Sequence, residues 1–366
     1  MNNACNRIYK RRNRKLIGFI GGEMLEKFGG WSTILSELCS GQNLTAEKTE
    51  ALLSEILSGE ADASQIAAFL IAIKIKGETT EEITGLVNAM LKVSQPLSVP
   101  VNAIDIVGTG GSIQRREAAL NVSTMASFIA AAAGAVVCKH GNRKASSTSG
   151  SFDFLEAFGL PVEQTPDEVS DQIHKKNLAF AFAKTFHPAM RFAGPVRAAL
   201  GIPTVFNILG PLSHPGRVSR HLIGTVDNVL ARQMAEVLLA QGAKRAWVVV
   251  GDGGLDEIAV TGSSNVMEVK DGFIKEWVLD PLTLGLSLHS SESIKGGTPE
   301  ENVQIAKRIF SGEEQGARRE MVLLNAAAGL VVADVVEDLS KGLEKAALSI
   351  EDGSVMKLIN SMQEHL

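Results

Sequence analysis

The hydrophobic period of this chain first changes at the proline pair Pro96 and Pro100, and that change limits the folds available to it. Before the pair, apolar residues recur at helical spacing; after it, short continuous apolar runs end in glycines, as buried strands do. The 366 residues, 45% hydrophobic and 21% charged, are long enough for two domains and exclude a disordered linker protein. Because proline breaks helices, we place the domain hinge at this pair.

The part before the prolines is predicted to be a small all-helical domain. Thr45 and Thr79 stand where helix caps are expected, with acidic residues in the turns that follow. A further helical stretch at roughly 187–200 could fold back against this domain. Four helices are expected, near residues 32–39, 46–57, 64–76 and 81–93, in a domain at 30–98 with a contribution from about 187–212.

The part after the prolines is predicted to be a large α/β domain, at 99–186 and 213–366, with a mostly parallel central sheet. Apolar runs alternate there with helical patterns, as in sheets covered by helices on their faces. In such sheets substrates bind at the carboxyl ends of the strands. Six strands are expected, within 103–107, 135–138, 178–183, 221–226, 246–251 and 265–270.

Charge is unevenly placed along the chain. The first fifteen residues hold six Lys and Arg and no acid, whereas the rest, with 30 basic and 41 acidic residues, carries a formal charge of −11. The basic extension at 1–29 could be a nucleic-acid arm, a transit peptide or a solvated tail, of which the tail is favoured. An acidic body argues against broad nucleic-acid affinity.

The cysteine content and the hydropathy indicate the cellular environment expected for this chain. Cys5, Cys39 and Cys138 are too few and scattered for a disulfide framework, and no C-x-x-C spacing offers a zinc site, so a reducing, cytoplasmic setting is expected. The longest apolar run, 125–138, is shorter than the roughly 20 residues that a bilayer requires.

Two segments of the expected sheet could receive phosphate. Gly108-Thr109-Gly110-Gly111 follows a strand, where glycines allow close backbone approach, but it matches neither the dinucleotide fingerprint nor the Walker loop. Asn121-Val122-Ser123-Thr124 precedes an alanine-rich helix, whose amino terminus can be capped by Ser or Thr and can also bind phosphate.

The sharpest signal is a polar loop that begins Lys139-His140-Gly141-Asn142-Arg143 and continues through Ser146, Ser147 and Ser149-Gly150-Ser151. Two cations and several hydroxyl groups would be costly to crowd together without a polyanion. We therefore predict a phosphate ligand here. Asp153 and Glu156 beyond it are expected in the next helix.

Two further groups suit a phosphorylated substrate. Asp256 and Glu257 follow a strand, and adjacent carboxylates suit Mg²⁺, which takes one or two of them together with substrate phosphates. A solvated acidic turn is the alternative. His187, in the segment FHPAM, and Arg197 are either ordinary helix and surface residues or a site in which the arginine pairs with a substrate carboxylate.

Taken together, the motifs resemble the anthranilate phosphoribosyltransferases of tryptophan biosynthesis. The resemblance is carried by DIVGTGG, NVST, KHGNR, FHPAM, VFNILGPLSHP and GLDE in that order, over about residues 30–350. It implies an enzyme, a homodimer, that transfers the 5-phosphoribosyl group from 5-phosphoribosyl 1-diphosphate to anthranilate with Mg²⁺ as cofactor. Alternatives are a pyrimidine nucleoside phosphorylase, which shares the architecture, and a non-catalytic nucleic-acid-binding relative.

The resemblance also implies site residues. No single catalytic group is implied, but Lys139 and Arg143 would support the transition state. The ribosyl donor would be held by Gly108, Gly111, Ser112, Asn121, Val122, Ser123, Thr124, Lys139, His140, Gly141, Asn142, Arg143, Lys144, Ala145, Ser146, Ser147 and Ser151. Anthranilate would contact Gly108, Asn142, Arg197, His140, His187 and Pro211, and Mg²⁺ would bind Ser123, Asp256 and Glu257.

One loop departs from the family pattern. The family's GTGGD continues to the NVST asparagine after six residues, whereas GTGG here is followed by nine, SIQRREAAL, with Ser112 in place of the acid. Either Arg115 and Arg116 take over charge neutralisation at the diphosphate, or the loop is weakened. We favour the first, because the other motifs are intact.

Overall fold

The computed structural model describes residues 25–112, 118–143 and 148–363. The chain separates into two compact units. In the described residues, the helical unit comprises 25–94 and 187–209, and the α/β unit comprises 95–186 and 210–363. Residues 1–24 of the basic extension lie outside the described residues, as do Arg115 and Arg116 of the loop that departs from the family pattern. Residues 25–29, expected in the extension, belong to the helical unit, where Leu25 is buried.

The helical unit contains the four predicted helices. Thr45 accepts a hydrogen bond from Lys48 N, and Thr79 accepts one from Glu82 N, so both predicted caps are confirmed. The stretch expected at 187–200 is two short helices rather than one, since prolines stand at both of their starts. The elements are α3 (Gly30–Cys39), α4 (Ala46–Ser58), α5 (Ala63–Lys76), α6 (Thr80–Lys92), η2 (Pro188–Arg191) and α11 (Gly194–Leu200); α12 (Phe206–Leu212) begins here.

The α/β unit is built on a seven-stranded sheet in the order β3-β2-β1-β4-β5-β6-β7. The first five in this order are parallel, and β6 pairs antiparallel with both β5 and β7. The strands are β1 (Ile104–Gly108), β2 (Val137–Gly141), β3 (Leu178–Phe182), β4 (Arg220–Gly224), β5 (Arg245–Val250), β6 (Ser264–Lys270) and β7 (Phe273–Leu279). The strand order reverses between β1 and β4, which is where open α/β sheets bind ligands. The predicted fold class is confirmed.

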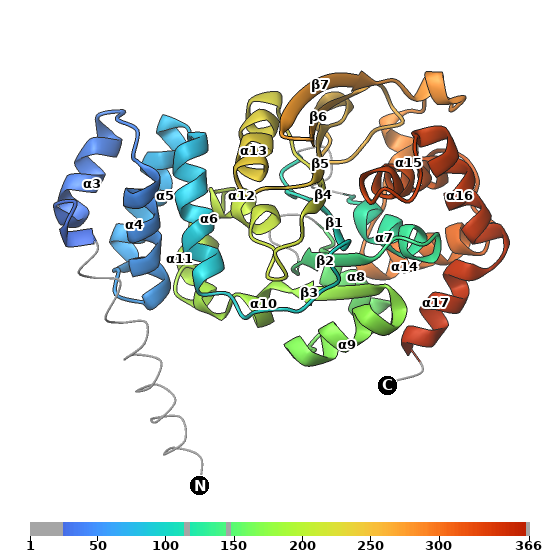
Figure 1. The fold of residues 1–366 in the computed structure, drawn as a ribbon, viewed down its shortest axis with the longest axis horizontal. Helices are drawn as coiled ribbons and strands as arrows, with labels where there is room; N and C mark the ends of the chain where they lie inside the picture. Colours follow the sequence, from blue (N-terminus) through green and yellow to red (C-terminus); the bar gives the residue numbers. More distant parts are fainter. Residues whose placement is uncertain (1–24, 113–117, 144–147, 364–366) are drawn as a thin grey trace, which may run out of the picture. The chain divides into compact units, whose positions relative to one another are not determined.

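Helices cover both faces of the sheet (Figure 1). α7 (Val122–Ala132) and α15 (Ala317–Val332) pack on the face that carries Ile104 and Ile106, and α13 (Asn228–Ala240) packs on the other face, against β5 and β6. The remaining elements of the unit are α8 (Ser151–Ala157), α9 (Pro166–Lys176), α10 (Ala183–Phe186), η3 (Asp252–Gly254), η4 (Pro281–Leu284), η5 (Ser291–Ile294), α14 (Pro299–Phe310), α16 (Leu339–Glu351) and α17 (Ser354–Gln363).

Strand β7 was not predicted, although its turn has a clear signal. Lys270 pairs with Phe273 across a two-residue loop, Asp271-Gly272, and both loop residues have positive φ. Asp-Gly between two β-runs is the sequence pattern of a type I′ hairpin. One face of β7 is exposed to solvent and carries charged residues. These residues interrupt the apolar pattern, so the sequence did not indicate a strand here.

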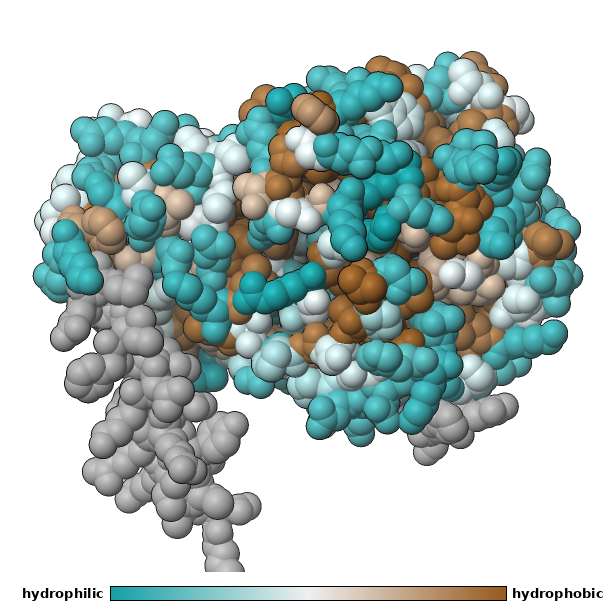
Figure 2. Space-filling model, in the orientation of Figure 1, coloured by the Kyte–Doolittle hydropathy of each residue, from teal (hydrophilic) through white to brown (hydrophobic). Residues whose placement is uncertain are grey.

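Hydrophilic residues dominate the face of the molecule that Figure 2 draws, and hydrophobic residues form separate patches on the α/β unit.

Among the described helices, none combines the length and the apolar content that a membrane crossing requires.

Candidate active site

The carboxyl ends of β1 and β4 form the floor of the candidate site. Gly108 and Gly224 are register partners, and Thr109 N donates to the Gly224 carbonyl at 2.9 Å. The acidic segment that follows β5 packs across both ends: Asp256 Oδ2 accepts a hydrogen bond from Gly110 N at 2.6 Å. A Cβ on Gly224 would lie 1.8 Å from the Asp256 carbonyl oxygen, so only glycine fits there.

Lys139, near the end of β2, joins two further segments to this floor. Its side chain is 2% exposed, and Nζ donates to the Ile106 carbonyl of β1 and, at 3.1 Å, to Ser123 Oγ of α7. The segments that begin at Gly108, Asn121, Lys139 and Asp256 therefore all reach the carboxyl end of β1. The structure brings together the phosphate-receptive segments that the sequence placed at strand ends and at the start of the alanine-rich helix.

The amino terminus of α7 differs from the expected cap. The helix begins at Val122, and Asn121 is its N-cap residue without a side-chain capping bond. The expectation that Ser123 or Thr124 caps the helix is therefore wrong, since both lie inside the first turn. Ser123 Oγ is directed to Lys139 instead, and the amino-terminal N–H groups of α7 keep their capacity for an anion.

Asn121 lies in a network of buried side chains. Its Oδ1 accepts from Ser149 Oγ at 2.8 Å, and its Nδ2 donates to the Gly150 carbonyl at 3.3 Å. A residue that the sequence did not single out, Asn302 of α14, also donates to Asn121 Oδ1, at 2.8 Å. These hydrogen bonds thus join the NVST segment to the SGS segment and to α14.

The Arg143 guanidinium is paired with acids of α8. Both guanidinium NH groups contact Glu156, and Asp153 lies 3.6 Å from Nη1. The two acids of the next helix therefore also pair with Arg143. The hydrogen bond from Arg143 lowers the pKa of Glu156. Since these groups are partly exposed, a phosphate could compete for Arg143 at little cost.

The backbone of this loop is also ordered by its own side chains. Asn142 Oδ1 accepts from Arg143 N at 2.8 Å, and Ser151 Oγ donates to the Asn142 carbonyl at 3.2 Å. A Cβ on Gly141 would lie 2.3 Å from Ser151 Oγ, which explains the glycine in KHGNR. Four predicted residues, Lys144, Ala145, Ser146 and Ser147, lie outside the described residues.

Asp105 supports the loop from inside the sheet and was missed by sequence reasoning. It is fully buried on β1, and its Oδ1 accepts from His140 N at 3.0 Å, while Oδ2 has no partner among the described residues. Burial raises the pKa of Asp105 to about 7, against the opposing effect of Lys139. An isolated acid inside an apolar run was the available signal. The His140 ring in turn contacts the Gly210 carbonyl through Nδ1, at 3.1 Å.

The residues assigned to anthranilate are divided between the two units. His187 and Arg197 belong to the helical unit, whereas Gly108, His140, Asn142 and Pro211 belong to the α/β unit. Within the helical unit, the Arg197 guanidinium lies over the Phe206 ring at 5.1 Å, and burial lowers the pKa of Arg197. Pro211 stands inside α12.

The donor set suits Mg²⁺. Asp256 is fully buried and Glu257 is 4% exposed, and carboxylate oxygens are ligands that Mg²⁺ prefers. Thr109 Oγ1 and Ser112 Oγ, in the segment after β1, are buried without a partner among the described residues. No group of three or more His, Cys, Asp or Glu side chains in the described ranges could hold a metal. Two carboxylates and a hydroxyl group fit an ion that completes its shell with water and phosphate.

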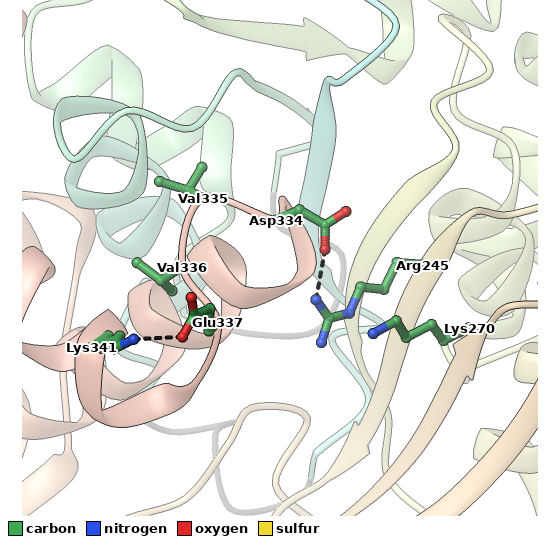
Figure 3. Close-up of a pocket in the computed structure, with 7 residues that line it drawn as sticks. All are labelled: Arg245, Lys270, Asp334, Val335, Val336, Glu337 and Lys341. Atoms are coloured by element: carbon green, nitrogen blue, oxygen red, sulfur yellow. Dashed lines mark hydrogen bonds and ion pairs between the residues drawn. The ribbon is translucent and has the colours of Figure 1, made fainter.

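A separate cavity of about 630 Å³ lies at the other end of β5 (Figure 3). It is lined by Arg245, Lys270, the segment that joins α15 to α16, and Lys341 of α16. Arg245 already binds Asp334 and Glu268, and Lys341 already binds Glu337, so the charges largely balance within the protein. This cavity is distinct from the candidate site, because Arg245 stands at the amino end of β5.

The chain matches the models of a glycosyl transferase family along most of its length. The helical bundle domain of that family matches residues 32–94, and its a/b domain matches residues 100–356. The fold and the site thus define a two-domain glycosyl transferase.

Known proteins narrow this class. The chain is 44% identical to an anthranilate phosphoribosyltransferase of Rhodococcus jostii (strain RHA1), over 90% of this chain and 91% of the relative. A crystal structure of anthranilate phosphoribosyltransferase from Thermus thermophilus is similar, with a TM-score of 0.83 and 37% identity over 90% of this chain and 98% of that one.

A second solved structure was determined with ligands. It is the anthranilate phosphoribosyltransferase from Saccharomyces cerevisiae in complex with PRPP and Mg, with a TM-score of 0.77 and 26% identity over 88% of this chain and 93% of that one. This chain belongs to the anthranilate phosphoribosyltransferase family. The family expected from the sequence motifs is confirmed.

Proposed function

We infer that this protein is a glycosyltransferase of tryptophan biosynthesis that transfers the 5-phosphoribosyl group from 5-phosphoribosyl 1-diphosphate to the amine of anthranilate and releases diphosphate. The observation that carries this inference is the convergence of Lys139, Ser123 and Asp256 at the carboxyl end of β1. Cationic, hydroxyl and carboxylate groups together suit a metal-bound, doubly phosphorylated sugar.

The chemistry requires one bond exchange at the anomeric carbon of the ribose. The bond from this carbon to the diphosphate oxygen breaks and its electron pair leaves with diphosphate, while the anthranilate nitrogen forms the new bond and then loses a proton. An aryl amine is neutral near pH 7, so little base catalysis is needed. The residues act by positioning the donor and by stabilising charge on the leaving diphosphate.

Specific residues are assigned to these tasks. Lys139 and Arg143 stabilise the developing negative charge, and the amino-terminal N–H groups of α7 bind phosphate oxygens. Asp256, Glu257 and Ser123 would hold Mg²⁺, which would supply positive charge to the leaving diphosphate. The remaining donor-binding residues are Gly108, Gly111, Ser112, Asn121, Val122, Thr124, His140, Gly141, Asn142 and Ser151, with Lys144, Ala145, Ser146 and Ser147 of the segment outside the described residues. Anthranilate is bound by Arg197 and His187 together with Gly108, His140, Asn142 and Pro211.

Anthranilate fluorescence tests the assigned reaction. Mixing anthranilate with the ribosyl donor, Mg²⁺ and protein should decrease the fluorescence, and leaving out any one component should abolish the change. No decrease, together with phosphate-dependent cleavage of thymidine or uridine, would identify a nucleoside phosphorylase instead. A salt-dependent shift of a labelled oligonucleotide without turnover would identify a nucleic-acid-binding protein. The cytoplasmic location expected from the cysteine content remains part of this proposal.

We also propose that the protein forms a homodimer through α5. Ile66, Phe69, Leu70 and Ile73 of this helix are buried in the helical unit. Ala68, Ile71, Ala72 and Ile75 form a second apolar stripe at spacings of three and four residues, and Ile75 is 81% exposed. An amphipathic helix needs one apolar face, so the second face suits another copy of the chain.

Light scattering coupled to size exclusion tests the dimer. The wild type should have the mass of two chains, and Ile75→Glu should have the mass of one. Val229→Glu is the matched control, because Val229 is 71% exposed on α13 of the α/β unit. A dimer that persists in Ile75→Glu, or is lost equally in both variants, would contradict the assignment of this face.

A further inference from the structure

Asn302 is a buried side chain of α14 whose amide has a single possible orientation. Its Oδ1 accepts from Gly297 N at 3.1 Å, and its Nδ2 donates to the Ala119 carbonyl at 2.7 Å. A backbone N–H can only donate and a backbone C=O can only accept. The two backbone groups therefore fix which end of the Asn302 amide carries the hydrogens.

The orientation of the Asn302 amide determines the orientation of the Asn121 amide. Asn302 Nδ2 also donates to Asn121 Oδ1 at 2.8 Å, and Ser149 Oγ donates to the same oxygen at 2.8 Å. With Oδ1 occupied, the Asn121 amide nitrogen is turned toward Gly150, whose carbonyl it contacts at 3.3 Å. The nitrogen thus faces the SGS segment, where the sequence and the fold place the phosphorylated ligand.

The contact between α14 and the NVST segment depends on close backbone packing. Gly296 N donates to the Ala118 carbonyl at 2.9 Å. A Cβ on Gly296 would lie 2.4 Å from Asn302 Oδ1 and 2.5 Å from the Ala119 carbonyl oxygen. Only glycine allows the loop before α14 to hold Asn302 against Asn121.

We propose that Asn302 is a positioning residue that fixes the Asn121 amide with its N–H groups, and not its carbonyl oxygen, toward the phosphorylated ribosyl donor. The inference rests on the proposed function, because it concerns the ligand of that same site. An amide N–H donates to a phosphate oxygen, whereas an amide oxygen repels it. Asn302 contacts no substrate itself, but it determines whether Asn121 presents a hydrogen-bond donor or an acceptor to the phosphate.

The isosteric variant Asn302→Asp inverts this polarity. The carboxylate presents an oxygen where Nδ2 donated, so the Asn121 amide must rotate to donate to it and then presents its own oxygen to the ligand. The Kd of 5-phosphoribosyl 1-diphosphate with Mg²⁺, measured by titration calorimetry without anthranilate, should rise about 10- to 100-fold, the range for a lost hydrogen bond to a charged group. The turnover number at saturating donor should change less than this Kd.

Two further variants separate positioning from folding. Val303→Ala is the matched control: it removes buried apolar contacts from the next residue of the same helix without changing any polar group near Asn121. It should lower the melting temperature and leave the Kd within about twofold of the wild type. Asn302→Ala should weaken donor binding less than Asn302→Asp, because Ser149 still donates to Asn121 Oδ1.

Each outcome of these measurements either supports or overturns the positioning role of Asn302. Weaker donor binding in Asn302→Asp than in Val303→Ala, at a comparable melting temperature, supports the inference. Equal affinities in these two variants overturn it, as does an unchanged Kd in Asn302→Asp. If Asn302→Asp does not fold, an Asn302→Ala protein that binds no more weakly than Val303→Ala overturns it. A wild-type protein that does not bind the donor would instead refute the proposed function itself.

Discussion

At the scale of single residues, the buried acid Asp105 determines a pH dependence of stability. Burial raises its pKa to about 7 from the ordinary 3.8, so the folded protein holds a proton that the unfolded chain releases. The stability tied to this proton is fully present below pH 3.8 and is lost as the pH rises through 7. Asp105 therefore destabilises the fold at alkaline pH, where its charge is buried beneath the KHGNR segment.

Replacing Asp105 by asparagine should remove that dependence. The amide of Asp105→Asn keeps an oxygen for His140 N but does not titrate, so the variant should gain stability relative to the wild type by about 2 kcal/mol between pH 5 and pH 8. Urea unfolding at the two pH values measures the difference. Asp171→Asn, which changes an acid whose side chain is 72% exposed, is the control. Parallel stability profiles for wild type and Asp105→Asn would refute the argument.

At the scale of elements, the start of α6 depends on one buried carboxylate. Glu82 accepts hydrogen bonds from Leu44 N and from Thr79, and it forms an ion pair at 2.8 Å with Lys76, whose side chain is 6% exposed. Glu82→Gln leaves the Lys76 charge buried without its partner. We expect a loss of about 3–5 kcal/mol in the free energy of unfolding.

Urea denaturation of the whole chain tests this expectation. Asp171→Asn breaks an exposed pair with Lys175 and should cost only about 0–1 kcal/mol. If the two variants lose equal stability, the buried pair does not anchor α6.

The packing of β4 against the acidic segment gives a second prediction for this scale. In Gly224→Ala the new Cβ would meet the Asp256 carbonyl oxygen, so the Asp256-Glu257 segment must move while the sheet stays intact. A displacement of about 1 Å at a catalytic site can cost on the order of 100-fold, and we expect kcat/KM to fall by that amount. Steady-state kinetics measures it, and a folded variant with full activity would contradict it. Gly194→Ala, which meets no atom within 4 Å, is the control.

The elements also show which parts of the structure the sequence could predict. Strands β1 to β6 and helices α3 to α6 were predictable because their apolar periods are regular and their caps are local. The convergence of the predicted segments followed from the rule that parallel strands end at the same edge of a sheet. The pairing of Arg143 with Glu156 and the buried contact between Asn302 and Asn121 were not predictable. Asn302 and Asn121 lie far apart in the chain, and only their packing places them in contact.

At the scale of the whole molecule, ligand binding and stability should be coupled through Asp256 and Glu257. A ligand that binds only the folded state stabilises it by about 2.7 kcal/mol at 100 times its Kd. The ribosyl donor with Mg²⁺ should therefore raise the melting temperature of the wild type. Asp256→Asn/Glu257→Gln should lose most of that rise, because two buried carboxylates no longer attract the ion that links protein and diphosphate.

The same double variant separates metal chemistry from substrate recognition. Its turnover number should fall by more than its affinity for anthranilate, since the proposal assigns the acids to the leaving diphosphate and Arg197 to the other substrate. Chelating Mg²⁺ from the wild type should reproduce the lost thermal stabilisation, whereas Glu276→Gln, an exposed acid of β7, should change neither property. A donor-induced melting shift that survives in both the chelated wild type and the double variant would show that the donor binds without a metal held by this pair. The charge of the diphosphate would then have to be neutralised by Lys139, Arg143 and the amino terminus of α7 alone.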